Sequence, residues 1–352
     1  MDKVRIGVIG LGIMGELYVR IYAAHPLAQV VAVSSRRQSR VDEIQTQYGV
    51  EAGYTNYRKM LERNDLDAVV VATPDAHHFI PARDVLESGK HTFVEKPFTT
   101  SVAEADELVR IAKDKSLKIQ VAFNHRWLSP YQQAKMSIAQ GEIGEPLAGY
   151  ARKNDTIFVA TEYINWAGQT TPAWFLSSHD IDLMRWFLDS EPTEARAWGR
   201  KSVLAARGIP TYDIIQSQVK FASGAFVTFE SAWVYPNTFP SIVDSFVEII
   251  GGAGHIHMDR KCESIEISTA KQFSYPKGFL NLEIFGRMRG AFPSCLEDFL
   301  YAVLDNTVPR VTGLDGRQVT ATLEAIHKSL ESGNTESVTQ PSQVDPVSDA
   351  RP

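Results

Sequence analysis

The chain has 352 residues, a hydrophobic content of 44% and a formal net charge of −6. That length favours about two domains with hydrophobic cores of ordinary size. Basic residues are scattered rather than clustered, and no run approaches the ~18 apolar residues of a membrane span, so we expect a small-molecule partner, no nucleic acid and no membrane.

The N-terminus and the cysteines indicate the compartment. The sequence MDKVRIGVIGLG is charged and runs directly into an apolar strand, without the regions of a secretory signal. Cys262 and Cys295 have neither metal-type spacing nor a disulfide framework around them. We therefore expect a cytoplasmic protein without a bound metal.

The first 123 residues alternate between apolar strands and helices. Strands are expected at 4–9, 30–33, 68–72, 91–95 and 118–122. Helices are expected between them, at 13–24, 40–48, 57–64, 79–88 and 102–115. Strand, helix and strand within about 30 residues form a βαβ unit, so this part predicts a doubly wound parallel sheet of the α/β class, with five to six strands.

Beyond residue 124 the pattern favours a second α/β domain with an open, mostly antiparallel sheet. Residues 221–229 and 246–258 each hold a glycine-containing turn between two apolar arms. Further strands are expected at 147–152, 194–200 and 264–268, and helices at 131–140, 178–188, 293–304 and 317–332. This domain is assigned to residues 124–332, and its last helix is able to pack back on the first domain. The polar segment 333–352 is expected to be disordered or loosely draped.

One face of the second sheet is expected to carry its helices. The other face, with Phe226, Phe229 and Val247, would then be apolar and exposed. A second subunit would cover it, so we expect a homodimer or homotetramer.

A glycine-rich sequence, Gly10-Leu11-Gly12-Ile13-Met14-Gly15, follows the first strand and opens the first helix. In that context the first glycine allows a tight turn, the second lets the backbone approach a pyrophosphate, and the third lets helix and strand pack closely. The helix N-terminus supplies free N–H groups. We interpret residues 1–123 as a Rossmann dinucleotide-binding domain. The alternative is a glycine-rich turn without a ligand. The expected cofactor contacts here are Gly10, Gly12, Ile13, Met14 and Gly15.

The end of the second strand indicates which dinucleotide binds. An acidic residue there would hold a ribose 2′-hydroxyl, but this chain has Ser34, Ser35, Arg36 and Arg37. Hydroxyls followed by two positive charges suit a 2′-phosphate, so NADP is the first choice of cofactor. In the alternative, the arginines are solvated surface charges and NAD binds through serine and backbone contacts.

A later strand end also carries polar groups at the carboxyl edge of the parallel sheet, where open α/β sheets bind ligands. Thr73 and Pro74 form a turn that is followed by His77 and His78. Adjacent histidines rarely share one metal geometry, so helix capping or contact with the nicotinamide is favoured over a metal site.

Lys96 emerges at the same edge, between Glu95 and Pro97. Its ammonium could neutralise a pyrophosphate, or hydrogen-bond a substrate hydroxyl and favour its alkoxide. A surface lysine is the alternative, but the following proline argues against free movement, and a cis peptide there would aim the side chain.

The motifs GVIGLGIMG, TPDAHH, GKHTFVEKP, FNHRW, HDIDLMRWF and VTGLDGR occur in this order between residue 4 and about residue 331. Together they resemble the glucose-fructose oxidoreductase / inositol dehydrogenase (Gfo/Idh/MocA) family. The resemblance implies a Rossmann domain followed by an open-sheet domain, with the active site between them. It also implies that Lys96 contacts nicotinamide ribose and substrate, that Glu95 helps to fix the domains, and that the bond before Pro97 is cis.

A proton acceptor is needed when an alcohol loses hydride, and histidine has a suitable unperturbed pKa. His179 begins an expected helix, and Asp182 lies three residues later on the same face, so the carboxylate is expected to orient the imidazole. Taken alone, His179 is more simply a helix-start or core histidine. The resemblance favours catalysis by Lys96, His179 and Asp182.

One position departs from the family. Many sugar- and inositol-oxidising relatives carry an aspartate four residues before this histidine, where this chain has Phe175. Either Lys96 and His179 act alone, or Asp180 or Asp182 substitutes, or the pocket is inactive or repurposed.

Aromatic and hydrogen-bonding residues suited to a polyol accompany these motifs. Trp166 stands where the family often has a Trp-Arg pair and is expected against the nicotinamide or a sugar face, although Ala167 replaces the arginine. For each residue alone, packing is the alternative. The expected substrate contacts are Asn124, Arg126, Tyr163, Asn165 and His179. The remaining cofactor contacts are expected at Thr73, Pro74, His78, Glu95, Lys96, Pro97 and Trp166.

The expected function is hydride transfer between NADP or NAD and a secondary alcohol of a sugar, sugar derivative or cyclitol. One alternative on the same fold is a reductase of a non-sugar substrate, such as a dihydrodiol, an imine or a biliverdin-like compound. The other is a non-catalytic NADP-binding regulator.

Overall fold

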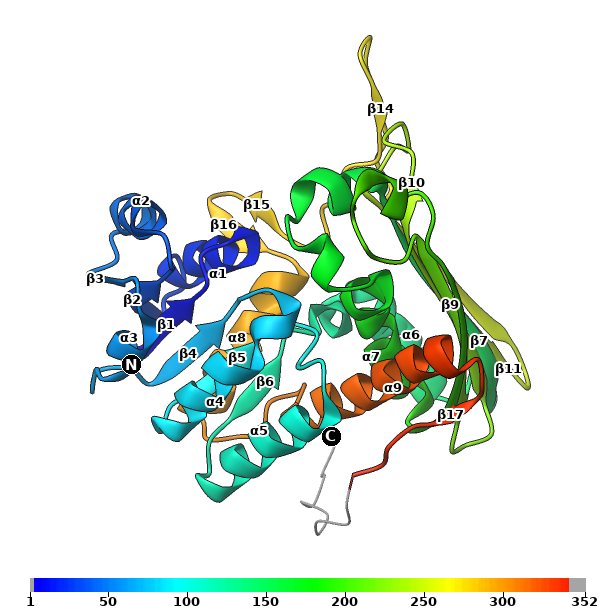
Figure 1. Ribbon diagram of the computed structural model, residues 1–352, viewed down its shortest axis with the longest axis horizontal. Coiled ribbons are helices and arrows are strands. Elements are labelled where there is room, and N and C mark those ends of the chain that lie inside the picture. Colours follow the sequence, from blue (N-terminus) through cyan, green and yellow to red (C-terminus); the bar gives the residue numbers. More distant parts are fainter. Residues whose placement is uncertain (1–2, 342–352) are drawn as a thin grey trace.

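Two main sheets and their helices form the described part of the chain, residues 3–341 of the computed structural model (Figure 1). A parallel sheet lies on one side and a larger sheet stands on the other. Helices α7 (Ser178–Leu188) and α9 (Gly313–Ser332) lie between them. The expected α/β class, a Rossmann sheet followed by an open sheet, is confirmed.

All strands of the N-terminal sheet are parallel. In chain order they are β1 (Val4–Ile9), β2 (Ala28–Ser34), β3 (Ala52–Tyr54), β4 (Ala68–Val71), β5 (His91–Val94) and β6 (Ile119–Val121). The spatial order β3-β2-β1-β4-β5-β6 is the one that binds dinucleotides at its carboxyl edge. We did not expect β3, a short edge strand whose residues are only half-buried.

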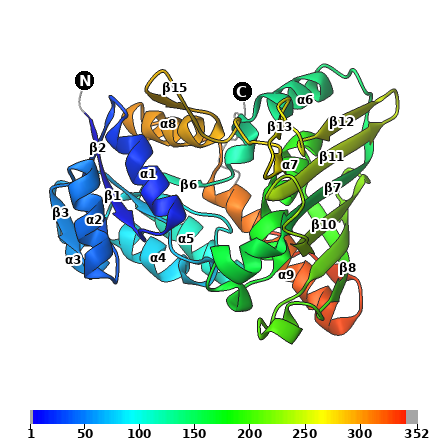
Figure 2. The ribbon, with the colours of Figure 1, turned by 90° about the horizontal axis from the view of Figure 1, so that it is seen from above.

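Helices cover both faces of this sheet (Figure 2). The first five are α1 (Ile13–Ala23), α2 (Gln38–Tyr48), α3 (Tyr57–Leu61), α4 (Phe79–Glu87) and α5 (Val102–Asp114). Helix α8 (Ala291–Leu304) joins α1 on one face, while α4 and α5 lie on the other. Buried residues of α8, such as Leu296 and Phe299, share a core with β1 and α1. A helix from late in the chain thus completes the N-terminal layer.

The second sheet is mixed rather than purely antiparallel. Its strands are β7 (Pro146–Thr156), β8 (Pro192–Arg200), β9 (Ile214–Phe221), β10 (Phe226–Tyr235), β11 (Val243–Gly251), β12 (His255–Asp259) and β17 (Glu336–Ser337). They follow the order β12-β11-β7-β10-β9-β8-β17, and β7 and β10 form the one parallel pair among the described strands of this sheet.

The strand expected at residues 264–268 does not join the second sheet, so that expectation was wrong. Its last residues form β13 (Ile267–Ser268), which pairs with β14 (Phe273–Ser274) in a separate hairpin that projects from the body of the molecule (Figure 1). A second small hairpin follows, β15 (Leu282–Ile284) with β16 (Arg287–Arg289).

The helix-bearing face of the second sheet was also assigned incorrectly. Phe229 and Val247 point to the inner face and are 1% and 0% exposed, whereas Phe226 is 54% exposed. Phe226 and Phe229 are three residues apart, and side chains alternate along a strand, so they must lie on opposite faces. Helix α6 (Ser129–Ala139) packs on α7, which covers the inner face together with α9.

Helix α9 joins the two layers. A Cβ atom at Gly316 would lie 2.7 Å from Val121 of β6 and 2.8 Å from Phe98, so the glycine permits close contact with the N-terminal sheet. Toward its other end, Ser329 accepts a 2.9 Å hydrogen bond from the backbone N–H of Ala197 in β8. The helix therefore connects the two sheets directly.

The chain after α9 is ordered as far as residue 341, so the expected loose tail was wrong for this part. Strand β17 extends the second sheet, and Val338 is 3% exposed and donates a 2.8 Å hydrogen bond to the carbonyl of Thr193. Residues 342–352 lie outside the described residues.

Candidate active site

The glycine-rich turn between β1 and α1 leaves room for a ligand. Gly10 has φ of +91°, and a Cβ atom there would lie 2.5 Å from the carbonyl of Ala72. A Cβ atom at Gly15 would lie 1.8 Å from the carbonyl of Gly10. Gly12, directly before Ile13 at the start of α1, has no neighbouring atom within 4 Å of such a Cβ. Gly10 and Gly15 close the turn, and the open space beside Gly12 forms a cradle below the helix N-terminus. This cradle fits a pyrophosphate.

The end of β2 presents positive charge beside that cradle. The carbonyl of Ser34 accepts a hydrogen bond from Gly10, and the backbone N–H of Ser35 donates to Tyr54. Arg36 and Arg37 are exposed, and their guanidinium groups form no hydrogen bond or ion pair with any described residue. They differ from Arg40, which is bound to Glu16 and to the carbonyl of Leu11.

His78 connects two strand ends at the carboxyl edge. Its Nδ1 lies 2.6 Å from the carbonyl oxygen of Pro97 and its Nε2 lies 2.7 Å from that of Thr73. The turn at Thr73 and Pro74 is closed by a 2.8 Å hydrogen bond from the Thr73 hydroxyl to the carbonyl of His77. No group of described residues could hold a metal ion, and the His78 imidazole bonds backbone carbonyls.

Lys96 follows β5 and points toward the second sheet. The Lys96–Pro97 peptide is cis. The Lys96 ammonium donates a 2.7 Å hydrogen bond to the carbonyl of Phe175 and lies 3.9 Å from the centroid of that residue's ring. Burial lowers the pKa of Lys96, while Asp75, Glu95 and Asp155 act in the opposite direction.

Glu95 lies under this lysine. Its carboxylate accepts a 2.9 Å hydrogen bond from the Lys96 backbone N–H and another from the hydroxyl of Tyr18 in α1. Burial raises the pKa of Glu95. Both partners belong to the N-terminal layer, so these hydrogen bonds hold the lysine loop on α1 rather than joining the two domains.

His179 lies in the first turn of α7, after the π-helical turn η5 (Ala173–Ser177). Its ring stacks on that of His125, with 4.1 Å between centroids and 13° between planes, and its Nδ1 has no hydrogen-bond partner among the described residues. Burial, helped by the charges of Lys96 and Lys153, holds the pKa of His179 well below its usual range. The imidazole is therefore neutral and able to accept a proton.

Asp182 does not orient His179, contrary to our expectation. Its two carboxylate oxygens accept hydrogen bonds of 2.9 and 2.6 Å from Arg126, which also bonds Asp315 at 3.0 Å. Burial alone would lower the pKa of Arg126, but the two carboxylates outweigh it and raise that pKa. Arg126 is thus held in a buried ion pair and is not free for a substrate. Asp180, the other candidate on this helix, pairs with Lys153.

The other residues expected to contact substrate or cofactor differ in how exposed they are. Asn124 is 1% exposed, and neither polar atom of its amide has a partner among the described residues. Trp166 packs edge-to-face on Phe175 with 5.8 Å between centroids. Tyr163 is 41% exposed, and Asn165 is also exposed. Trp166 is thus linked to Lys96 through the Phe175 ring, and Asn124 directly precedes His125, whose ring stacks on that of His179.

Sequence reasoning missed Lys153 and Asp155 of β7. Both occupy inward positions of the strand and are 4% and 5% exposed. A detectable signal was present, because charged residues at alternate positions of a strand that packs on helices are unusual. Asp75 was likewise not assigned to the site. Asp75 is buried and accepts a 2.8 Å hydrogen bond from Thr170, and burial raises its pKa to about 6.

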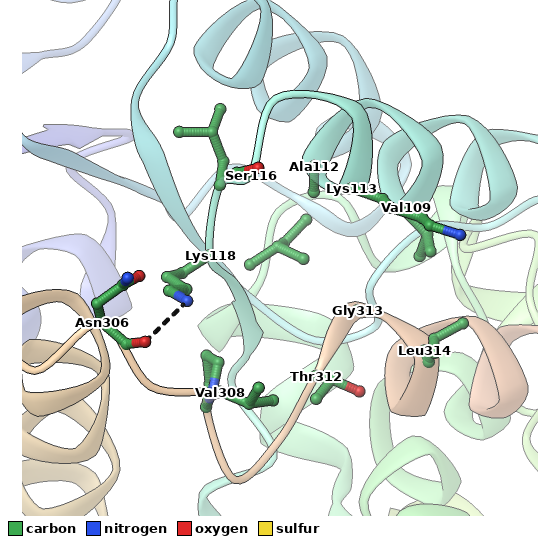
Figure 3. Close-up of a pocket in the computed structure, with 13 residues that line it drawn as sticks. Val109, Ala112, Lys113, Ser116, Lys118, Asn306, Val308, Thr312, Gly313 and Leu314 are labelled. Carbon is green, nitrogen blue, oxygen red and sulfur yellow. Dashed lines mark hydrogen bonds between the residues drawn. The ribbon is translucent and has the colours of Figure 1, made fainter. Parts of the chain in front are cut away.

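A separate cavity of about 410 Å³ lies between α5, β6 and the start of α9 (Figure 3). Lys118, whose ammonium reaches the carbonyl of Asn306 at 3.4 Å, precedes β6 and so marks the amino edge of the parallel sheet. Dinucleotides bind at the opposite, carboxyl edge. This cavity is therefore remote from the candidate active site.

Comparison with known proteins shows that the chain is a nicotinamide-dependent oxidoreductase. Residues 4–123 match the family described as an oxidoreductase family with an NAD-binding Rossmann fold, and residues 131–257 match the C-terminal domain of the same family. The chain belongs to the Gfo/Idh/MocA family. No described helix is long and apolar enough to cross a membrane.

Similar proteins extend over nearly the whole chain. Myo-inositol 2-dehydrogenase of Thermotoga maritima is 28% identical over 93% of this chain and 96% of its own. The NAD⁺-dependent scyllo-inositol 2-dehydrogenase of Bacillus subtilis is 29% identical, over 89% and 90%. The fold is similar to the crystal structure of scyllo-inositol dehydrogenase from Lactobacillus casei with bound NAD(H) and scyllo-inositol. Its TM-score is 0.83 and its identity 22%, over 96% of this chain and 99% of that one.

Proposed function

We propose that this chain is an NAD(P)-dependent dehydrogenase that oxidises a secondary alcohol of a cyclitol, sugar or sugar derivative. The observation that carries the proposal is the approach of Lys96, at the carboxyl edge of the parallel sheet, to the helical turn that precedes His179. The lysine bonds the backbone of η5, one turn before His179, and its charge acts on the imidazole. The inositol dehydrogenases among its relatives support a cyclitol as the first substrate to test.

The reaction divides between cofactor and protein. When bound in the cradle, a nicotinamide cofactor would supply the acceptor for the hydride of the reacting carbon. Neutral His179 accepts the hydroxyl proton, and the Lys96 ammonium donates a hydrogen bond to the same oxygen as negative charge develops on it. The cradle at Gly12 holds the pyrophosphate, and Trp166 forms an aromatic wall beside Phe175.

We infer a preference for NADP over NAD. The support is the pair of exposed arginines after Ser35, whose guanidinium groups have no partner among the described residues, and the lack of an acidic residue at the end of β2. The B. subtilis relative is NAD⁺-dependent by name, so this preference needs a direct test. Titration of the protein with each dinucleotide, followed by tryptophan fluorescence, should give at least about tenfold tighter binding of NADP. Equal or tighter binding of NAD would overturn it.

We propose that the protein forms a homo-oligomer and is located in the cytoplasm. Phe226, Ala148 and Ile250 pair across β10, β7 and β11, and the two large side chains are 54% and 47% exposed on the outer face. A second copy would cover this row. Light scattering should give a dimer or tetramer, and Phe226→Asp should shift the protein toward the monomer. A monomeric wild-type protein would contradict the proposal.

The dehydrogenase proposal is tested by cofactor reduction with cyclitols and sugars as substrates. Reduction by at least one of them supports it. Oxidation of NADPH by an imine or dihydrodiol-type substrate alone would favour the non-sugar reductase. Tight NADP binding without turnover in any assay would favour the regulator.

A further inference from the structure

Three carboxylates act on the buried ammonium of Lys96: those of Asp75, Glu95 and Asp155. Glu95 is bonded to Tyr18 and to the lysine backbone. The carboxylate of Asp75 accepts from the hydroxyl of Thr170. None of the three forms an ion pair with a described residue, and the Asp155 carboxylate accepts no hydrogen bond from a hydroxyl or backbone group among the described residues, so it is the least committed of the three.

Asp155 enters the site from the floor of the second sheet. It follows Ala151 and Lys153 at alternate positions of β7, so its side chain shares their inward face. It interacts with the indole of Trp233 in β10. That indole packs edge-to-face on Phe175, 5.5 Å between centroids, and Phe175 carries the Lys96 ammonium on its ring. The Phe175 ring thus lies against both the Lys96 ammonium and the Trp233 indole, and the carboxylate of Asp155 acts electrostatically on the same ammonium.

The two aspartates of α7 cannot take this place. Asp180 is paired with Lys153, and Asp182 with Arg126, and all four side chains are at most 10% exposed. Breaking either pair would leave an uncompensated buried charge. Phe175 contributes only its ring and its backbone carbonyl to Lys96.

We propose that Asp155 is the carboxylate that anchors the substrate beside Lys96, by accepting hydrogen bonds from hydroxyl groups next to the reacting carbon. The proposal rests on the dehydrogenase function proposed above and narrows its substrate to a neutral polyol with vicinal hydroxyls. A carboxylate has two oxygens and accepts from two neighbouring hydroxyls at once, whereas a simple alcohol offers it none.

The charges around Asp155 suit this role. It is faced by Lys153 from its own strand, by Lys96 from the end of β5, by Tyr163 from the turn η3 (Val159–Tyr163) and by Trp233 from β10. Burial raises the pKa of Asp155 to about 7, against the pull of the two lysines. Hydroxyl donors from a polyol favour the ionised form, so kcat/KM should rise with pH across the neutral range.

The test compares Asp155→Asn with the wild type on a cyclitol and on a cyclic alcohol that lacks the adjacent hydroxyls. Asp244→Asn is the matched control, because Asp244 is a buried aspartate of the neighbouring strand that pairs with Arg152. We expect the wild type to prefer the cyclitol by about 100-fold in kcat/KM or more, and Asp155→Asn to reduce this preference to about tenfold or less. The KM for the cyclitol should rise, the rise of kcat/KM near neutral pH should vanish, and cofactor affinity should not change.

The outcomes separate the two proposals. If Asp155→Asn keeps both the preference and the pH profile of the wild type, Asp155 is structural and this inference is overturned while the dehydrogenase function stands. A folded variant that loses activity equally on both alcohols would also overturn it. If the wild type turns over no alcohol while binding cofactor, the dehydrogenase function itself fails.

Discussion

The Lys96 ammonium lies 3.9 Å from the centroid of the Phe175 ring and donates a 2.7 Å hydrogen bond to the Phe175 carbonyl. An ammonium group has three donors, so one is used by this carbonyl and two remain for a substrate. The aromatic face stabilises the cation in a buried place without neutralising it. Phe175 therefore positions the lysine through its backbone carbonyl and its ring, although it has no carboxylate like the aspartate that many relatives carry at this position.

Replacement of Lys96 by Met should lower kcat by about 10³-fold, because the developing alkoxide loses its charged donor. Dinucleotide affinity should change by no more than about threefold, since the glycine cradle remains intact. Steady-state kinetics and fluorescence titration measure the two quantities. Lys220→Met, at an exposed site of β9, is the control and should behave as the wild type. Near-normal turnover of Lys96→Met would remove the lysine from the mechanism.

Replacement of His179 by Gln should lower kcat/KM by about 10²- to 10⁴-fold, because the amide cannot accept the substrate proton. The measurement is initial rates at saturating cofactor. His257→Gln changes an exposed histidine that packs on Phe246 across the outer face, and it should have no such effect. Equal rates for the two variants would exclude His179 as the proton acceptor.

Alanine substitutions in the glycine-rich turn should distinguish effects on stability from effects on dinucleotide binding. Gly12→Ala meets no atom within 4 Å, so its melting temperature should match the wild type while dinucleotide affinity falls. Gly15→Ala places its Cβ 1.8 Å from the Gly10 carbonyl, so it should destabilise the protein as well. Thermal unfolding with and without dinucleotide checks both. Unchanged affinity in Gly12→Ala would mean that the cradle is not the pyrophosphate site.

Asp182→Asn should act on stability rather than on chemistry. It leaves Arg126 buried with Asp315 alone, and loss of one partner of a buried pair costs about 3 kcal/mol of unfolding free energy. Asp114→Asn breaks an exposed pair with Arg110 and should cost less than about 0.5 kcal/mol. Urea unfolding compares them. A stable Asp182→Asn protein with a large loss in kcat would restore the catalytic role that we first expected for Asp182.

Asp155 should make the protein less stable as pH rises. Its pKa is about 7 in the folded chain against an ordinary 3.8, so between these values the folded state binds a proton that the unfolded state has lost. Stability from this group is present at low pH and declines through that window. Without ligand, Asp155→Asn should therefore melt at a higher temperature than the wild type at about pH 8 and at a similar one below about pH 4. If the difference in melting temperature between Asp155→Asn and the wild type is the same at both pH values, the pKa of Asp155 is not raised.

The sequence predicted the Rossmann half well because its signals are local. Continuous apolar runs such as Ala68–Val71 are typical of strands buried on both faces, and the glycine spacing at residues 10–15 determines a single turn. The second sheet was harder. The strand expected at 264–268 contains apolar residues but pairs outside the sheet, and β17 joins β8 from the far end of the chain. Pairing between distant segments leaves little local signal.

The site shows the same division between local and distant information. Lys96 and Glu95 were found because a proline and a motif surround them, whereas the position of Asp155 near Lys96 depends on segments that lie far apart in the sequence. Helical spacing suggested that Asp182 would reach His179, but Arg126 from the segment after β6 captures it instead. Spacing of i and i+3 shows which residues share a face, and tertiary partners decide what each contacts.

The most direct test of the account is the initial rate of NADP or NAD reduction by myo-inositol, scyllo-inositol and a panel of sugars, with wild-type protein and Lys96→Met in parallel. We predict reduction by at least one vicinal polyol with the wild type and a loss of about 10³-fold with the variant. Dinucleotide binding without reduction by any of these alcohols, or equal rates for the two proteins, would contradict the proposed dehydrogenase.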